Sequence, residues 1–219
     1  MASFVSGARK RSALTSVHAA LVALVLLPTL ASAADDAKTE GAKEVASSFN
    51  EALLASMKNA DALGYKGRYA QLRPVVVRTF DIPFMAEKVL GRHWEGLPEA
   101  ERAQWRELFA DLLTATYAGR FVGYRGQTFA TLGEENAARD TVLVLTRLDD
   151  PKGDPVVINY RLSHTDAGWR VVDVYLKGTV SELALRRSDY SAVLDRQGFP
   201  ALLEAVRAKI AALERGEDK

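Results

Sequence analysis

One long apolar segment, residues 168–178, most constrains what this chain can fold into. It reads Gly-Trp-Arg-Val-Val-Asp-Val-Tyr-Leu-Lys-Gly, so β-branched and aromatic residues fill it and a glycine lies at each end. This composition predicts a β-strand. Strict alternation would place Val172, Val174 and Leu176 on one face and Trp169, Val171, Asp173 and Tyr175 on the other. Because both faces carry apolar side chains, other elements must cover both of them at least in part.

Further strand-like segments precede this one, at 128–132, 140–148 and 156–163. In the last of them Val156, Ile158, Tyr160 and Leu162 share one face, which makes it the most regular strand. The polar stretch 149–154 and the short segment 165–168 have the composition of tight turns. The sequence therefore predicts an antiparallel meander of about four strands joined by hairpins.

Helical periodicity dominates the rest of the chain. Apolar residues recur at helical spacing over 43–58, 66–79, 84–90 and 98–123, and in a C-terminal tail that follows Ser181. Asp81 and Ser181 are good N-cap residues, Pro74 predicts a kink, and Gly91 and Gly198 predict a helix end and an interruption. We expect one α+β domain, in which helices close the concave face of a curved sheet.

The N-terminus has the pattern of a secretory signal peptide. A basic cluster at 9–11 precedes an apolar run, and Ala31-Ser32-Ala33 then supplies small residues for cleavage. We expect residues 1–33 to be removed by cleavage after Ala33, residues 34–42 to form a flexible leader, and residues 43–215 to form a single domain. A membrane anchor is the alternative, but Pro28 and the short apolar core argue against it.

The absence of cysteine and the net charge indicate the cellular compartment and the class of partner. The chain has no cysteine, so it lacks the residue to which a lipid anchor would be attached at the cleavage site, and it can form no disulfides. Its formal net charge of +1 is nearly balanced, which gives no indication of nucleic-acid binding. These features favour a protein that is free, without a lipid anchor or disulfides, in an oxidising compartment.

Catalytic and cofactor motifs are missing from the sequence. His93 and His164 lie in different elements and neither has ligand spacing to a carboxylate, so we expect no metal. There is no P-loop, dinucleotide fingerprint or G-x-S-x-G motif, so we expect no cofactor. Asp173, inside an apolar strand, is the best candidate for a general base, although such a carboxylate is more often bonded to its neighbours.

In place of catalytic motifs, the predicted strands and helices carry apolar faces that can pack against one another. We expect the face of Val156 and Ile158 to lie opposite Leu108, Leu112 and Tyr117 on the long helix. The space between could be ordinary core or a ligand cavity, and composition alone favours core.

Two sequence blocks resemble the MlaC family of periplasmic lipid-binding proteins, also described as toluene-tolerance auxiliary components of ABC-type lipid transporters. The first block is the run 80–94, which includes Met85-Ala86 and Leu90-Gly91-x-x-Trp94, followed by 98–105 and Tyr117. The second is 168–174, followed by Ser181, Arg187, Tyr190, Gly198 and Leu202-Leu203. The resemblance covers nearly all of the chain after residue 33, and its motifs are structural rather than catalytic.

The resemblance implies a cone-like fold of the NTF2/cystatin type with an apolar cavity between sheet and helices. It implies a soluble carrier, not an enzyme, that takes up acyl chains and shuttles them between membranes. There is one departure from the family: Gly178-Thr179-Val180-Ser181 has one residue more than the usual Gly-x-Ser, and we consider it together with the segment 65–69. Both are more similar to HpnM, the branch associated with hopanoid synthesis, so the ligand could be a phospholipid or a hopanoid.

The implied partners are inner-membrane transporter components and an outer-membrane complex, with transient membrane contact. The side chains expected to line the pocket are Phe84, Met85, Val89, Leu108, Leu112, Tyr117, Phe121, Val144, Val156, Ile158, Tyr160, Leu162, Val172 and Val174. Two other functions stay open: a small NTF2-like enzyme, which would need polar groups converging in the pocket, and a periplasmic adaptor that binds proteins.

Overall fold

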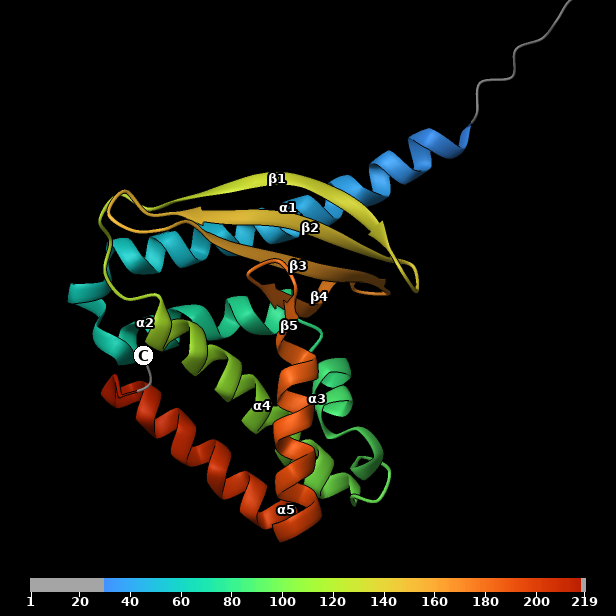
Figure 1. Cartoon of the computed structure of the whole chain (residues 1–219), viewed down its shortest axis with the longest axis vertical. Coiled ribbons are helices and arrows are strands. Elements are labelled where there is room, and N and C mark those ends of the chain that lie inside the picture. The colour runs from blue at the N-terminus through green and yellow to red at the C-terminus, as the bar shows by residue number, and fades with distance from the viewer. Residues whose placement is uncertain (1–29, 218–219) are drawn as a thin grey trace, which may run out of the picture.

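The computed structural model describes residues 30–217, with side chains from residue 41 onward (Figure 1). The predicted signal peptide therefore lies almost entirely outside the described residues. The segment 34–42, expected to be a flexible leader, belongs to the first helix, which begins at Leu30. No helix among the described residues combines the length and the apolar character needed to cross a bilayer.

A five-stranded antiparallel meander forms one side of the molecule. Its strands are β1 (Thr128–Ala137), β2 (Thr141–Asp149), β3 (Val156–Thr165), β4 (Gly168–Leu176) and β5 (Val180–Ser181), and they pair in chain order. The predicted α+β meander is confirmed. It is larger than expected, because β1 continues past residue 132 and β5 adds a short pairing with Tyr175 and Leu176.

A β-bulge in β4 overturns the expected division of that strand into two faces. Arg161 pairs with Asp173 but the next residue, Leu162, pairs with Val171, so Val172 has no partner in β3. The extra residue reverses the alternation. Val171 and Val174 consequently share the inner, helix-facing side, and Val172 lies outside the core that they join. Strict alternation had placed Val172 beside Val174, which is wrong.

The helices lie on the concave side of the sheet (Figure 1). They are α1 (Leu30–Lys58), α2 (Ala60–Thr79), α3 (Ile82–Leu90), the 3-10 turn η1 (Gly91–His93), α4 (Glu99–Arg120) and α5 (Glu182–Arg215). Gly64 and Gly198 interrupt α2 and α5 with non-helical dihedral angles, as glycine permits. Pro74 lies inside α2 without non-helical dihedral angles, so the helix does not restart there, and α4 ends at Arg120 rather than at the predicted Gly123.

The helix ends follow the capping signals. The Asp81 carboxylate accepts a hydrogen bond from the Phe84 N–H at 3.0 Å, and the Ser181 hydroxyl accepts one from the Ala184 N–H at 3.0 Å. Gly91 has a φ of 55°, a conformation that favours glycine. These caps set where α3 and α5 begin, and both helices therefore start next to β4.

Aromatic rings hold the sheet against the helices. Phe49 of α1 packs edge-on against Phe80, Tyr117 and Tyr160, with ring centroids 5.1, 4.9 and 6.0 Å away. The Tyr160 hydroxyl donates to Asn50 Oδ1 at 2.7 Å. This aromatic cluster fills the space between α1 and the middle of β3.

Candidate functional site

A cavity of about 400 Å³ lies between the sheet, α4 and the first turn of α5. It occupies the end of the sheet where β3 begins and β4 ends. Its walls are mainly apolar, formed by Met57, Met85, Leu113, Tyr117, Phe121, Val122, Leu148, Val156, Ile158, Val174, Leu176 and Leu183. Its size falls in the range of ordinary ligand pockets.

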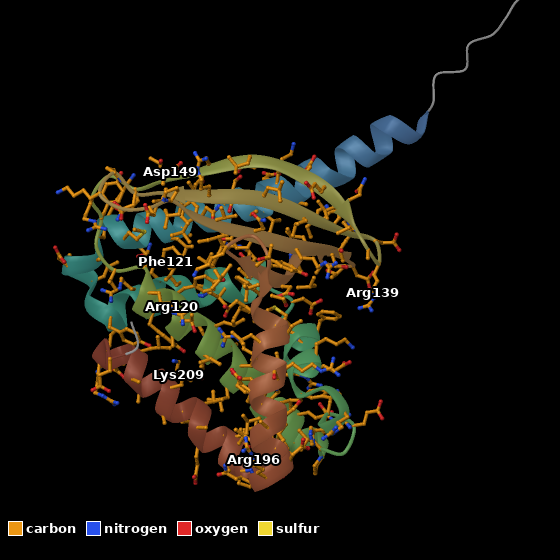
Figure 2. The ribbon with its side chains drawn as sticks, viewed as in Figure 1. Arg120, Phe121, Arg139, Asp149, Arg196 and Lys209 are labelled. Atoms are coloured by element: carbon orange, nitrogen blue, oxygen red, sulfur yellow. The ribbon has the colours of Figure 1, made fainter. Side chains whose placement is uncertain are left out.

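Periodicity explains why these side chains converge. Leu113, Tyr117 and Phe121 are spaced four residues apart and therefore share one face of the C-terminal half of α4. Ile158 pairs with Leu176 across β3 and β4, so both point to the same side of the sheet. The aromatic side chain of Phe121 lies between the sheet and the helices, next to Arg120 at the end of α4 (Figure 2).

Charged side chains surround the apolar walls. Arg125 and Gln127 both bond to Asp150, and Arg186 lies 3.4 Å from Glu182 on the first turn of α5. The backbone N–H of Lys152, together with Arg125 and Gln127, lowers the pKa of Asp150. Arg120 and Asp154 complete the polar part of the lining. Arg120, Arg125 and Asp154 are exposed, so much of this charge lies at the rim of the cavity and its inner walls are mainly apolar.

Exposed apolar residues lie at the mouth of the cavity. Val122 and Val156 both line the cavity and are 51% and 43% exposed. The adjacent Tyr124 is also exposed, with the Lys58 ammonium 5.3 Å from its ring centroid. We call Val122, Tyr124 and Val156 the apolar collar of the cavity. An exposed apolar patch of this kind is suited to contact with an apolar surface or ligand.

The Tyr117 hydroxyl is the main polar group on the inner wall. Burial raises the pKa of Tyr117 well above its ordinary value, so the phenol stays protonated near neutral pH. No hydrogen bond to this hydroxyl is found among the described residues. A protonated phenol can donate to an oxygen of a ligand but cannot act as a general base.

The structure brings together part of the predicted set of lining residues. Met85, Tyr117, Phe121, Val156, Ile158 and Val174 line the cavity. In contrast, Val89, Leu112, Val144, Tyr160 and Leu162 are buried in the core and do not line the cavity. Leu108 borders a separate shallow pocket between α2, α4 and α5. Phe84 and Val172 line a third pocket, next to the outer side of β4.

Several lining residues were missed by the sequence reasoning. Leu113 could have been found, because it lies four residues before Tyr117, and Leu176 could have been found from its place on the apolar strand. Met57, Leu148 and Leu183 carried no comparable signal. They belong to α1, β2 and α5, and only the tertiary structure brings these elements to the same cavity.

The groups considered for chemistry have other roles in this structure. Asp173 accepts hydrogen bonds from the Val174 and Leu183 N–H groups, at 2.8 and 3.0 Å, and from the Ser181 hydroxyl at 2.6 Å. It therefore joins β4 to the start of α5. His93 lies 3.1 Å from Asp195, and the described residues contain no cluster of acidic or histidine side chains that could hold a metal ion.

Comparison with known proteins agrees with this architecture. A solved structure similar to this chain is that of the phospholipid-binding protein from Ralstonia solanacearum in complex with a phospholipid. It is 24% identical, with a TM-score of 0.68, over 78% of this chain and 97% of the other. At this level of identity the match supports the fold alone. A comparison with curated protein sequences finds no match.

The family model described as MlaC protein matches residues 47–208. The matched region begins within α1 and ends within α5, so it includes the whole sheet and every wall of the cavity. A match over this much of the chain identifies the family, and the chain belongs to the MlaC family.

Proposed function

We propose that this protein is a periplasmic lipid carrier that holds acyl or hopanoid chains in the cavity between β3, β4, α4 and α5. The observation that carries the proposal is the cavity itself, which is apolar along its walls and rimmed with charge. A lipid has the same division, because its tails are apolar and its head group is polar. The family and the phospholipid-bound relative support the same reading.

The energetics of lipid transfer explain the need for a carrier. Each CH₂ group moved from water to an apolar site gains about 0.8 kcal/mol. Crossing an aqueous gap unaided would therefore cost a two-tailed lipid well over ~10 kcal/mol on that scale. A cavity that shields the tails removes most of this barrier.

The ligand class follows from the lining rather than from any catalytic group. The charged groups near the cavity are engaged with one another, as in Arg125–Asp150 and Arg186–Glu182. A phospholipid would place its head group among these ions, and a hopanoid would use the apolar walls more fully. Chemical identification of the co-purified lipid distinguishes the two.

The remaining parts of the proposal concern location and partners. MlaC proteins are periplasmic, in agreement with the signal-peptide pattern and with a cut after Ala33. N-terminal sequencing of the exported protein tests the cut. We further propose exchange with an inner-membrane ABC-type transporter and with an outer-membrane complex, through transient contact at the exposed apolar collar of the cavity.

The experiment compares two substitutions on the same face of β3. Ile158 lines the cavity, whereas Leu162 is fully buried in the core. Ile158→Trp fills the cavity and is expected to lower the amount of lipid extracted from the purified protein, while the ligand-free protein keeps its melting temperature. Leu162→Trp overpacks the core and should cost about 1–3 kcal/mol of unfolding free energy.

Lipid content is measured by extraction and mass spectrometry, and stability by thermal unfolding with and without lipid. Wild-type protein should gain stability from bound lipid by mass action, and Ile158→Trp should lose that gain. A full lipid complement in Ile158→Trp would contradict the proposal. So would a large loss of stability in its ligand-free form, because that would identify the space as ordinary core.

A further inference from the structure

The third pocket, next to the outer side of β4, has a volume of about 590 Å³. Its walls come from α3, the turn between β1 and β2, strands β3 and β4, and the first turn of α5. Leu183 is shared with the lipid cavity, and every other lining residue is different. We call it the outer pocket. Its charge differs from that of the lipid cavity. Arg125 and Arg186 of the lipid cavity form ion pairs, whereas three of the four cations that line the outer pocket form none among the described residues.

Three arginines from separate elements line the outer pocket: Arg139 from the β1–β2 turn, Arg161 from β3 and Arg187 from α5. Among the described residues none of them forms an ion pair. The guanidinium of Arg161 lies 5.9 Å from the Tyr175 ring centroid, and its Nε–H is buried without a hydrogen-bond partner. Arg139 lies near the tip of the β1–β2 hairpin (Figure 2). The hydrogen-bonding capacity of these guanidinium groups is thus largely unused.

The two carboxylates in the same walls form no ion pair with these arginines among the described residues, and both accept hydrogen bonds from neutral donors instead. Asp81 caps α3 through the Phe84 N–H, and Asp173 holds the start of α5 through three hydrogen bonds. The remaining cation, Lys88, is bonded to Glu87 at 2.5 Å. The outer pocket therefore retains unpaired positive charge.

Apolar and aromatic surface accompanies the charge. Phe84 is 38% exposed, and its ring lies 5.3 Å from the Lys88 ammonium. Tyr175, Val172 and Leu183 complete this part of the wall. An occupant must therefore combine negative charge with an apolar group.

The geometry points to an acidic peptide segment of a partner protein as the occupant, with carboxylates on the arginines and an apolar side chain against Phe84. Carboxylates are matched by guanidinium groups in two-bond geometry. A phosphate suits this pocket less well. The helix N-termini that would otherwise bind a phosphate already donate their N–H groups to Asp81 and Asp173, so these groups are not available to it. Separate arginines on three elements fit several singly charged groups spaced along a chain.

The test uses the mature protein and a random library of eight-residue peptides on beads, with fluorescence of the labelled protein as the readout. Bound beads should be enriched in peptides with Asp or Glu beside an apolar residue. For a selected peptide in solution, Arg139→Gln combined with Arg187→Gln should weaken binding at least about tenfold, because both arginines lose charge-assisted bonds. Both are exposed, so the substitutions leave the core intact.

The matched control is Arg78→Gln combined with Arg207→Gln, which removes the same charge from exposed sites outside the outer pocket. This control should bind the peptide almost as tightly as wild type. Three results would each overturn the proposal: bound beads without acidic enrichment, equal weakening by both double variants, or binding of inorganic phosphate or phosphatidylglycerol vesicles as tight as that of the peptide. Lipid extraction from the Arg139/Arg187 variant should be unchanged, so this test is independent of the lipid cavity.

Discussion

The two ends of the inner sheet face are built from similar residues but meet different surroundings. At one end Tyr160 and Leu162 are fully buried, and Tyr160 packs against Phe49 of α1. At the other end Ile158 and Leu176 line an open cavity with Tyr117 and Phe121 of α4. Both ends carry apolar side chains on the same strand, so apolar character alone does not separate core from binding site. The difference lies in which helix reaches the sheet.

Matched phenylalanine truncations should show the largest difference between the two ends. Phe49 is fully buried at the packed end, and Phe121 is partly buried at the cavity. Phe49→Ala should cost about 3–5 kcal/mol of unfolding free energy. Phe121→Ala should cost less than about 1.5 kcal/mol, because its side chain already borders open space.

Urea unfolding of the ligand-free protein measures both changes. Phe121→Ala should in addition lower lipid content, whereas any lipid lost from Phe49→Ala should follow the loss of folded protein. Equal destabilisation by the two truncations would show that the cavity end is packed like the core.

Removal of one hydroxyl group at each end, from Tyr160 and from Tyr117, should give a smaller difference in unfolding free energy. Tyr160 donates a buried hydrogen bond to Asn50, and the Tyr117 hydroxyl has no such partner among the described residues. Tyr160→Phe should cost about 1–2 kcal/mol because it leaves Asn50 Oδ1 unsatisfied. Tyr117→Phe should leave stability nearly unchanged.

The same unfolding measurement distinguishes these outcomes, and lipid extraction supplies a second readout. If the Tyr117 hydroxyl bonds to a ligand, Tyr117→Phe should lower lipid affinity without lowering ligand-free stability. A large loss of stability in Tyr117→Phe would mean that its hydroxyl has a protein partner.

Alkaline pH tests the buried tyrosines of both ends together. Burial raises the pKa of Tyr65 and Tyr69 from 10.0 to about 12, and it raises the pKa of Tyr117 and Tyr160 well above 10.0. Below pH 10 both the folded and unfolded states keep these protons. As the pH rises above 10, the unfolded state loses them first, so stability should fall between about pH 10 and 12.

Unfolding free energies at several pH values, with tyrosinate absorbance as a direct monitor, test this dependence. Tyr160→Phe should reduce the fall in stability, and Tyr124→Phe, at an exposed site, should not. A fall that is the same in both variants would show that the buried tyrosines are not its source.

Much of the fold follows from local patterns in the sequence. The alternating segments predicted the meander, and Asp81 and Ser181 marked where α3 and α5 begin. These properties depend on neighbours within a turn or a strand, so the chain encodes them locally. The family resemblance rested on the same segments and is confirmed by the family match.

The tertiary structure alone decided which apolar faces are core and which are cavity. The bulge at Val172 reversed the second half of β4, and no local pattern distinguishes a strand with one extra residue from a regular one. Tyr160 and Ile158 share one face of β3, but Phe49 and Asn50 of α1 pack against the first, whereas the second lines the cavity. The reason is physical: burial depends on the distance between elements, and helix packing sets that distance only after the whole chain has folded.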